Sequence, residues 1–396
     1  MIEILESDRH PLPPSCDEAV SYTRELVRME SITPSDGGVQ HWIAEKLLYL
    51  GASVEQFNIN GVSNLIARFD FGEGPSLAFC GHTDVVPPGD ISKWHYPPFA
   101  ANIKNGLLYG RGVADMKGGI ACAIAAIENL IEEQTAINGQ FWFLITSDEE
   151  GEAEFGSKEI VNKLLAQGVK IDYSLIGEPT ASRYSGDVIK IGRRGSLSFE
   201  LIIRGKSAHV AYSDKGINAI HLMSKIINSL ADIDWAQDPT DDLVTTLQVT
   251  HISSGEWTDN IVPSKTGIHF NVRYTGRYTK SDIINIVNAK ISELVSDFTL
   301  IHSRNCEPFS SNFDKSDKGS MVEHARKAIW QVLGTFPVLS SRGGTSDGRF
   351  FKRVSNQVIE IGLPNGSIHQ ENERVAVQEI TRLHDIYKKL FSALLS

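Results

Sequence analysis

The chain has 396 residues, more than one compact core usually contains, so two domains are expected. Apolar residues make up 41% and charged residues 22%, as in an ordinary soluble globular protein. The net charge of −11 argues against a general nucleic-acid binder, which needs a basic face to displace counterions from phosphate, although local basic clusters remain possible.

Nothing in the sequence predicts a membrane-spanning or secreted protein. No run approaches the roughly 18 apolar residues of a membrane helix, and the N-terminus has no basic region followed by an apolar core. The cysteines are isolated and form no CxxC pair, which fits packing roles in a reducing compartment. They are Cys16, Cys80, Cys122 and Cys306. We therefore expect a cytoplasmic protein without a nucleic-acid or membrane partner.

The first half of the chain alternates predicted strands with predicted helices. Residues 1–16 carry three prolines and no apolar period, so a loosely held arm is expected there. Amphipathic spacing predicts one helix from Asp17 and another over 38–50, with Gly51 as the C-terminal cap of the second. Further strands are predicted at 64–69, 76–80, 141–146 and 173–176, and further helices at 120–130 and 156–167.

This alternation predicts an α/β domain, a mostly parallel sheet with helices on both faces. After Gly195 the order becomes βαββαβ, which is typical of a small sheet with two helices on one face. Its strands are predicted at 198–203, 243–252, 266–274 and 298–302, and its helices at 216–230 and 280–294. The α/β pattern then returns, with a helix at 321–333, a strand at 357–361 and a helix at 377–394. We predict a catalytic domain from 17–195 and 306–396 and an inserted α+β domain over 196–305.

Polar residues follow the predicted strands at their carboxyl ends, where parallel sheets bind ligands. In the clearest case, the apolar run 141–146 is followed by Asp148-Glu149-Glu150-Gly151. Adjacent carboxylates repel one another and are costly to desolvate, so a cation is expected beside them. No role is assigned to Asp148. The other candidate residues are His82, Asp84, Asp115, Glu178 and His369.

This candidate set contains imidazoles and carboxylates but no thiolate. Such a set suits Zn²⁺, Co²⁺ or Mn²⁺, whereas a calcium site would lack the histidines. Seven residues exceed the needs of one catalytic zinc, so two metals are expected. In a paired-metal hydrolase a water of lowered pKa attacks, and one acid stays unligated to take its proton. Glu149 and Glu150 point in different directions, so one of them could ligate while the other acts as the base.

Each motif also has a plainer interpretation. Asp84 could hold the far ring nitrogen of His82, but a lone His-x-Asp is more often a surface or capping pair. A Glu-Glu pair is usually a solvated face, Asp115 could cap the following helix, and Glu178 could belong to a simple turn. Their joint occurrence at strand ends favours the metal site.

Four motifs resemble those of the dinuclear zinc amidohydrolases of the aminoacylase and carboxypeptidase M20 family. They are 81–90 (GHTDVVPPGD), 110–118 (GRGVADMKG), 146–150 (TSDEE) and 177–179 (GEP), and the resemblance runs from about residue 17 to the C-terminus. It implies two Zn²⁺ per subunit, or Co²⁺ in their place. It assigns His82 and Glu178 to one zinc, Glu150 and His369 to the other, Asp115 as the bridge and Glu149 as the general base.

The resemblance also implies a homodimer formed through the inserted domain, in which His209 stabilises the oxyanion in the partner's active site. It places further polar residues near the carboxylates of an acylated amino acid, and arginine pairs carboxylates in a planar fork. These residues are Arg193, Ser196, Asn260, Arg273, Thr345 and Asn365. From the sequence alone, His209 is an ordinary loop histidine, Asn260 a turn residue and Arg193 part of a solvated pair with Arg194.

Later motifs at 186–190, 192–196, 209–212 and 343–350 resemble those of one kind of enzyme within the family, and this resemblance implies a particular reaction. It is hydrolysis of N-succinyl-LL-2,6-diaminopimelate to succinate and LL-2,6-diaminopimelate, a step towards lysine. The alternatives are deacetylation of acetylornithine, hydrolysis of another N-acyl amino acid, and a catalytically silent dimer that binds a ligand or metal. The arm at 1–16, Ser213 in place of a proline, and Pro364 beside Asn365 depart from the family pattern.

Overall fold

The computed structural model describes residues 17–236, 243–311, 317 and 319–396, and the predicted arm at 1–16 lies outside them. The chain divides into two compact units, each described here by itself. The first contains residues up to Ile191 together with Ser311–Ser340 and Ser346–Ser396, and the second contains Gly192–Ser310 and Ser341–Thr345.

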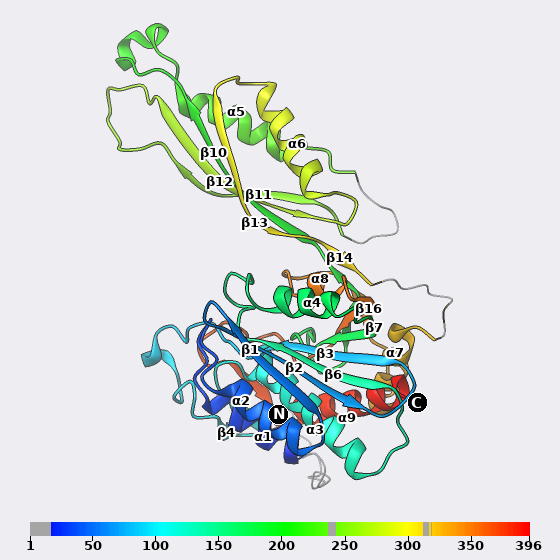
Figure 1. Ribbon diagram of the computed structural model, residues 1–396. Helices are drawn as coiled ribbons and strands as arrows, with labels where there is room; N and C mark the ends of the chain where they lie inside the picture. Colours follow the sequence, from blue (N-terminus) through cyan, green and yellow to red (C-terminus); the bar gives the residue numbers. More distant parts are fainter. Residues whose placement is uncertain (1–16, 237–242, 312–316, 318) are drawn as a thin grey trace, which may run out of the picture. The chain divides into compact units, whose positions relative to one another are not determined.

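The first unit is built on an eight-stranded sheet (Figure 1). In spatial order its strands are β1 (Ser53–Ile59), β2 (Val62–Asp70), β6 (Gln140–Thr146), β3 (Ser76–His82), β7 (Ile171–Ile176), β16 (Ser355–Glu360), β8 (Val188–Lys190) and β15 (Val338–Ser340). The four central strands, β6, β3, β7 and β16, are parallel neighbours. β6 is buried over almost its whole length, as expected for a parallel strand covered on both faces.

Helices cover both faces of this sheet (Figure 1). One face packs against α1 (Asp17–Arg28), α2 (Val39–Tyr49), α3 (Gly118–Glu132), α7 (Met321–Leu333) and α9 (Val377–Leu394), which share one hydrophobic core. The other carries α4 (Ser157–Ala166) and the short α8 (Gly348–Phe351). The predicted α/β fold is confirmed. Among the described residues, no helix is both long and apolar enough to cross a membrane.

A small sheet joins distant parts of the first unit. It contains β17 (Arg374–Ala376), β5 (Leu107–Tyr109) and β4 (Asn102–Lys104). Because Arg374 pairs with Tyr109, the segment before β17 lies beside the loop after β5.

The second unit is an antiparallel sheet with two helices. Its strand order is β11 (Thr246–Ser253), β12 (Lys265–Tyr274), β10 (Gly195–Arg204) and β13 (Phe298–Cys306), and its helices are α5 (Ala219–Ala231) and α6 (Lys280–Ser292). Asn218 caps α5, and Thr279 with Asp282 forms a capping box on α6. β9 (Gly192–Arg193) pairs with β14 (Phe309–Ser310) where the chain enters and leaves the unit. The predicted βαββαβ order is confirmed.

Several short or polar strands were not predicted. β1 is an edge strand whose residues are all at least partly exposed, so it lacks an apolar run. β8 and β15 have three residues each, too few to show a period. Cys80, Cys122 and Cys306 are buried, as predicted, and Cys16 lies outside the described residues.

Candidate metal centre

Polar residues follow the carboxyl ends of all four central strands. His82 is the last residue of β3, Glu149 and Glu150 follow β6, and Glu178 follows β7. His369 lies in the loop after β16, and Asp115 lies in the Val113–Lys117 segment that leads into α3. Residues far apart in the sequence therefore meet at one edge of the sheet.

Asp115 lies between the two histidines. Its Oδ1 is 3.3 Å from Nε2 of His82, and its Oδ2 is 3.3 Å from Nε2 of His369. Each of these ring nitrogens also faces a glutamate, since Oε1 of Glu178 is 3.5 Å from His82 and Oε1 of Glu150 is 2.9 Å from His369. The five residues therefore form two half-sites that share one carboxylate.

The ligand atoms of these residues also gather in overlapping groups. The atoms of His82, Asp115 and Glu150 lie within 4.8 Å of one another, as do those of His82, Glu149 and Glu178. Nε2 of His82 and Oδ1 of Asp115 are buried and lack a hydrogen-bond partner within the described chain. A set of nitrogen and oxygen atoms with such unmatched atoms fits divalent cations of the zinc type.

The pKa shifts follow from crowding of opposite charges. Hydrogen bonds that the His369 ring donates to the Asp115 and Glu150 carboxylates raise the pKa of His369 to about 10. Burial opposes protonation of His82, but the Asp115, Asp84 and Glu178 carboxylates outweigh burial and raise its pKa well above 6.5. Burial likewise disfavours the anion of Asp115, yet the two histidines hold its pKa below the usual value. Both imidazoles thus lie in strongly negative surroundings that attract a cation.

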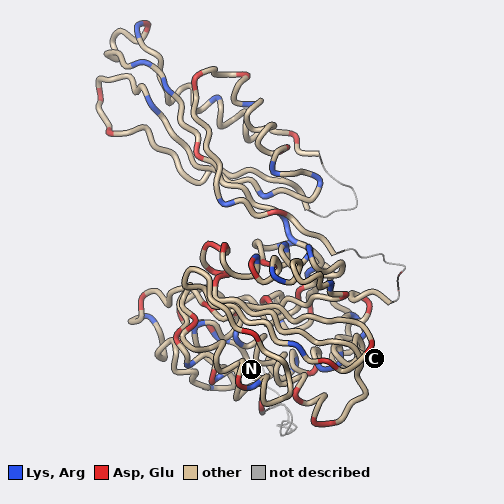
Figure 2. The backbone as a smooth tube through the Cα atoms, in the orientation of Figure 1, with Lys and Arg blue, Asp and Glu red and all other residues tan. Residues whose placement is uncertain are grey.

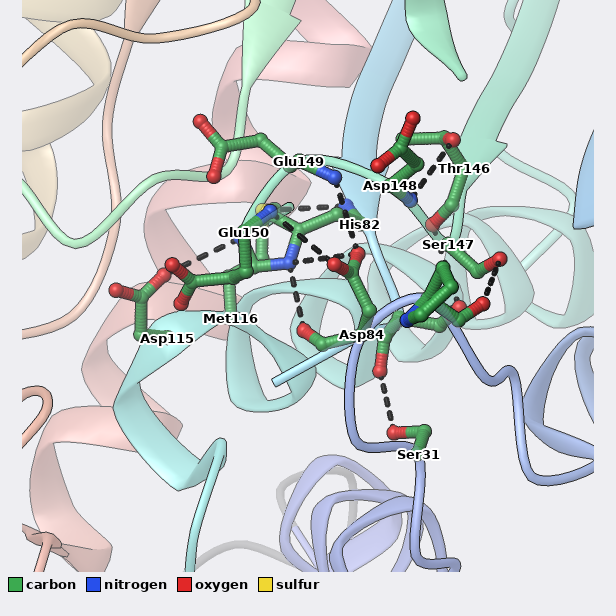
Figure 3. Close-up of polar contacts among 12 residues, drawn as sticks. Ser31, His82, Asp84, Asp115, Met116, Thr146, Ser147, Asp148, Glu149 and Glu150 are labelled. Carbon is green, nitrogen blue, oxygen red and sulfur yellow. Dashed lines mark hydrogen bonds and ion pairs between the residues drawn. The ribbon is translucent and has the colours of Figure 1, made fainter. Parts of the chain in front are cut away.

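The side chains of Glu149 and Glu150 point in different directions, and burial shifts the pKa of Glu149. Figure 3 shows the two side chains leaving the backbone in different directions, with Glu150 turned towards Asp115. Burial, followed by the charge of Glu178, raises the pKa of Glu149 well above 4.5. A carboxylate with a raised pKa is better suited to accept a proton than an ordinary surface glutamate.

Asp84 contacts both the histidine and the Glu149-Glu150 pair. Its backbone carbonyl lies 2.9 Å from Nδ1 of His82, whereas its carboxylate Oδ1 lies 3.6 Å from that nitrogen. The carboxylate accepts the backbone N–H groups of Glu149 at 3.2 Å and Glu150 at 3.1 Å (Figure 3). Asp84 therefore ties the end of β3 to the loop after β6.

Asp148 organises the acidic loop between β6 and α4, which is visible in Figure 2. Its buried carboxylate accepts the backbone N–H groups of Ala153 at 3.3 Å, Glu154 at 3.0 Å and Phe155 at 3.2 Å. The residue that had no predicted role thus holds the far side of the turn that carries Glu149 and Glu150.

Met116 packs between two glycines that precede candidate ligands. A Cβ atom at Gly81 or at Gly177 would lie 2.6 Å from Cε of Met116. The thioether sulfur also faces the backbone N–H of His82 at 3.4 Å. The absence of side chains at these glycines lets the loop that carries Asp115 approach β3 and β7. The sequence shows the glycines, but nothing in it identifies Met116 as their partner.

Most of the predicted substrate residues belong to the second unit. Ser196 and Arg273 are cross-strand partners on β10 and β12. Arg193 lies against the 341–345 loop, which contains Thr345, because a Cβ at Gly343 would be 2.3 Å from its Nη1. Asn365 belongs to the first unit, where its backbone N–H donates to the carbonyl of Ala181, close after Glu178.

His209 and Asn260 are neighbours in the second unit. His209 forms a β-bridge with Ile261, and the N–H of Val210 donates to the carbonyl of Asn260 at 3.0 Å. His209 is exposed, and its Nδ1 accepts the N–H of Ala211 at 3.1 Å. The neutral imidazole therefore carries its proton on Nε2, which can act as a hydrogen-bond donor.

The fold and the strand-end site are those of a metal-dependent hydrolase, and comparison with known proteins identifies the family. Residues 78–393 match the family Peptidase family M20/M25/M40, so the chain belongs to it. A solved M20 family metallo-carboxypeptidase from Sulfolobus solfataricus has the same fold, with a TM-score of 0.77 and 18% identity over 96% of this chain and 99% of that one.

Within this family, the chain is similar to enzymes of one named activity. It is 45% identical to succinyl-diaminopimelate desuccinylase 2 of Shewanella loihica, over 94% of this chain and 98% of the relative. It is 44% identical to succinyl-diaminopimelate desuccinylase 1 of Alteromonas mediterranea, over 95% of this chain and 96% of the relative.

Proposed function

We propose that the protein hydrolyses the amide bond of N-succinyl-LL-2,6-diaminopimelate, giving succinate and LL-2,6-diaminopimelate for lysine biosynthesis. The observation that carries the proposal is the 45% identity to a desuccinylase over 94% of the chain. The grouped histidines and carboxylates support the same chemistry, because hydrolysis of an unactivated amide needs an activated water and a polarised carbonyl.

We assign His82 and Glu178 to one cation, Glu150 and His369 to the other, and Asp115 to both. The distances between the ring nitrogens and the carboxylate oxygens support this division into two half-sites. When bound there, two Zn²⁺ ions, or Co²⁺ in their place, supply Lewis-acid polarisation and a water of lowered pKa. The remaining roles belong to the side chains.

Glu149 is the general base in this proposal. Its carboxylate takes a proton from the attacking water and delivers it to the amide nitrogen as the C–N bond breaks. The raised pKa of Glu149 supports both halves of this proton transfer, since the same group must accept and then release a proton near neutral pH. Asp84 keeps the base in place through the N–H group of Glu149.

The second unit forms a homodimer in this proposal, and His209 serves the partner's active site. β11 is an edge strand of the four-stranded sheet. Exposed apolar side chains lie on β11 and in the loop that follows it, among them Ile252, Trp257 and Ile261, and Trp257 is 87% exposed. An open edge and exposed apolar groups are features that a partner subunit can cover. The Nε2–H of His209 would then stabilise the negative charge that develops on the carbonyl oxygen.

Carboxylate recognition falls to Arg193 and Arg273, with Ser196, Asn260, Thr345 and Asn365 as polar partners. The substrate has a succinyl carboxylate and two amino-acid carboxylates, and guanidinium groups pair such groups in a planar fork. The adjacency of Ser196 to Arg273 and of Arg193 to the 341–345 loop supports grouped binding positions within the second unit.

The test is a comparison of kcat/KM on two substrates with purified, zinc-loaded protein. We expect N-succinyl-LL-2,6-diaminopimelate to be preferred over N-acetylornithine. A higher kcat/KM on acetylornithine would reassign the protein to the sister activity. Binding of either ligand without turnover would reassign it to a catalytically silent binder.

A further inference from the structure

Glu373 is a buried carboxylate close to the candidate ligands but outside their set. Its side chain is 1% exposed, and it precedes β17. Its charge is balanced by the equally buried Arg111, whose Nη1 lies 2.7 Å from Oε2. The pair joins the loop after β5 to the loop after β16, 262 positions apart in the sequence.

Glu373 also receives three backbone N–H groups of the loop that carries Asp115. Oε2 accepts from Gly112 at 3.0 Å, and Oε1 accepts from Ala114 at 3.0 Å and from Asp115 itself at 3.3 Å. With Arg111, four donors converge on one side chain. An ionised carboxylate has the acceptor capacity for four donors, whereas an amide would turn an NH₂ group towards some of them.

Backbone bonds support the loop on either side of Ala114 and Asp115, from the N–H of Val113 to the carbonyl of Gly110 at 3.2 Å and from the N–H of Lys117 to the carbonyl of Gly112 at 2.9 Å. Asp115 has φ −123° and ψ 91°, which is not a helical conformation, although α3 begins only at Gly118. Its N–H, like that of Ala114, is therefore bonded to a side chain. Glu373 therefore holds the backbone at the two positions that set the direction of the Asp115 side chain.

Glu373 and His369 belong to one short segment, residues 367–374. The ends of this segment are joined because Oγ of Ser367 donates to the carbonyl of Arg374 at 2.8 Å and accepts the N–H of Arg374 at 3.0 Å. Asn372 fastens it to another loop through the N–H of His95 at 2.6 Å and the carbonyl of Lys93 at 2.9 Å. One closed segment thus holds the ring of His369 and, through Glu373, the backbone of Asp115.

We propose that Glu373 is a positioning residue that sets the shared carboxylate of Asp115 relative to His369 and so controls cation binding in both half-sites. The inference rests on the proposed dinuclear function. It assigns Glu373 no contact with the substrate or with a cation. It predicts that loss of the carboxylate weakens metal binding even where the fold survives.

The experiment compares the wild type with E373Q, E373D and a matched control, E379Q. Glu379 is also a buried carboxylate, it accepts the N–H of Ser185 and pairs with Arg382, and it lies on α9 outside the candidate site. Metal-free proteins are titrated with Co²⁺ by calorimetry and visible absorption, and Tm is measured with and without Zn²⁺. These readouts need no substrate.

For E373Q we expect at least about tenfold weaker Co²⁺ binding, an altered visible spectrum, and a smaller rise of Tm on adding Zn²⁺. E373D keeps two acceptor oxygens and should recover part of the affinity. E379Q should lower Tm equally with and without Zn²⁺ and leave Co²⁺ binding unchanged.

The proposal is overturned if E373Q has the same Co²⁺ affinities, visible spectrum and Zn²⁺-dependent rise of Tm as the wild type. This holds even if metal-free E373Q is less stable than the metal-free wild type. If E373Q does not yield folded protein, the same comparison is decided by E373D, for which affinities equal to the wild type overturn the proposal. The two-substrate assay on the wild type tests the desuccinylase proposal separately, so the two can fail independently.

Discussion

The carboxylate of Asp84 holds the backbone of Glu150, with Oδ2 3.1 Å from the amide nitrogen. Oδ1 accepts the neighbouring N–H of Glu149 in the same way. One buried side chain, two residues beyond the end of β3, thereby fixes both a proposed ligand and the proposed base. The position of the acidic pair depends on this contact as well as on the strand that leads to it.

Replacement of Asp84 should therefore impair catalysis more than stability. We expect D84A to lower kcat by about 10- to 100-fold, because both acidic residues lose their anchor, and D84N to lose less, since it keeps one acceptor. Asp187 offers a matched control, because its carboxylate also accepts two successive backbone N–H groups, those of Ser182 and Arg183. A D84A enzyme with the kcat of D187A would contradict this role.

Removal of the proposed base should separate turnover from metal content. E149A is expected to retain about two metals per subunit yet lose roughly 10²- to 10⁴-fold in kcat, the usual contribution of a general base. Metal analysis and steady-state kinetics measure the two quantities. E152A, in the exposed part of the same loop, should behave like the wild type. Loss of metal from E149A would instead identify Glu149 as a ligand, as its proximity to His82 and Glu178 also permits.

Metal removal should lower the free energy of unfolding, because cations that bind only the folded protein stabilise it by mass action. A cation at about 100 times its Kd contributes about 2.7 kcal/mol. Thermal unfolding with a chelator and after readdition of Zn²⁺ measures the effect. In H82A the Zn²⁺-dependent rise of Tm should be smaller than in the wild type. A Tm that is unaffected by chelation would contradict the metal assignment.

Gly343 should matter for substrate binding through Arg193. Its φ is +125°, and an added Cβ would lie 2.3 Å from Nη1 of that arginine, so G343A must displace the guanidinium or the loop. We expect G343A to raise the KM for the succinylated substrate by about tenfold, because one charge-assisted hydrogen bond is lost, and to change kcat less. Gly344 has open space at the Cβ position, so G344A is the control. Equal KM values for the two variants would remove Arg193 from the binding site.

The sequence predicted the features that depend on local pattern. The apolar run Phe141–Thr146 became the buried strand β6, and the βαββαβ order of the second unit followed from periodicity alone. Strand-end placement also brought His82, Glu150 and Glu178 to one edge of the sheet, although the division between ligand and base came from resemblance to a family.

The unpredicted parts depend on contacts between residues distant in the chain. Glu373 and Arg111 are each ordinary charged residues in the sequence, and only the pairing of β17 with β5 brings them together. The sequence indicated neither that Arg111 is buried nor which acid balances its charge. The bonds that the backbone N–H groups of residues 153–155 donate to Asp148 were not predictable either, since they require a loop shape that has no periodicity.

The packing of Met116 against Gly81 and Gly177 constrains how this site can evolve. An alanine at Gly81 meets the flexible tip of the methionine, so the cost of that change depends on which residue occupies position 116. A shorter side chain at 116 leaves a cavity on its own but also makes room for the added methyl group. The two substitutions should therefore be epistatic, with the change at 116 acting as the permissive step. We therefore expect this glycine to vary in lineages that have a small residue at position 116.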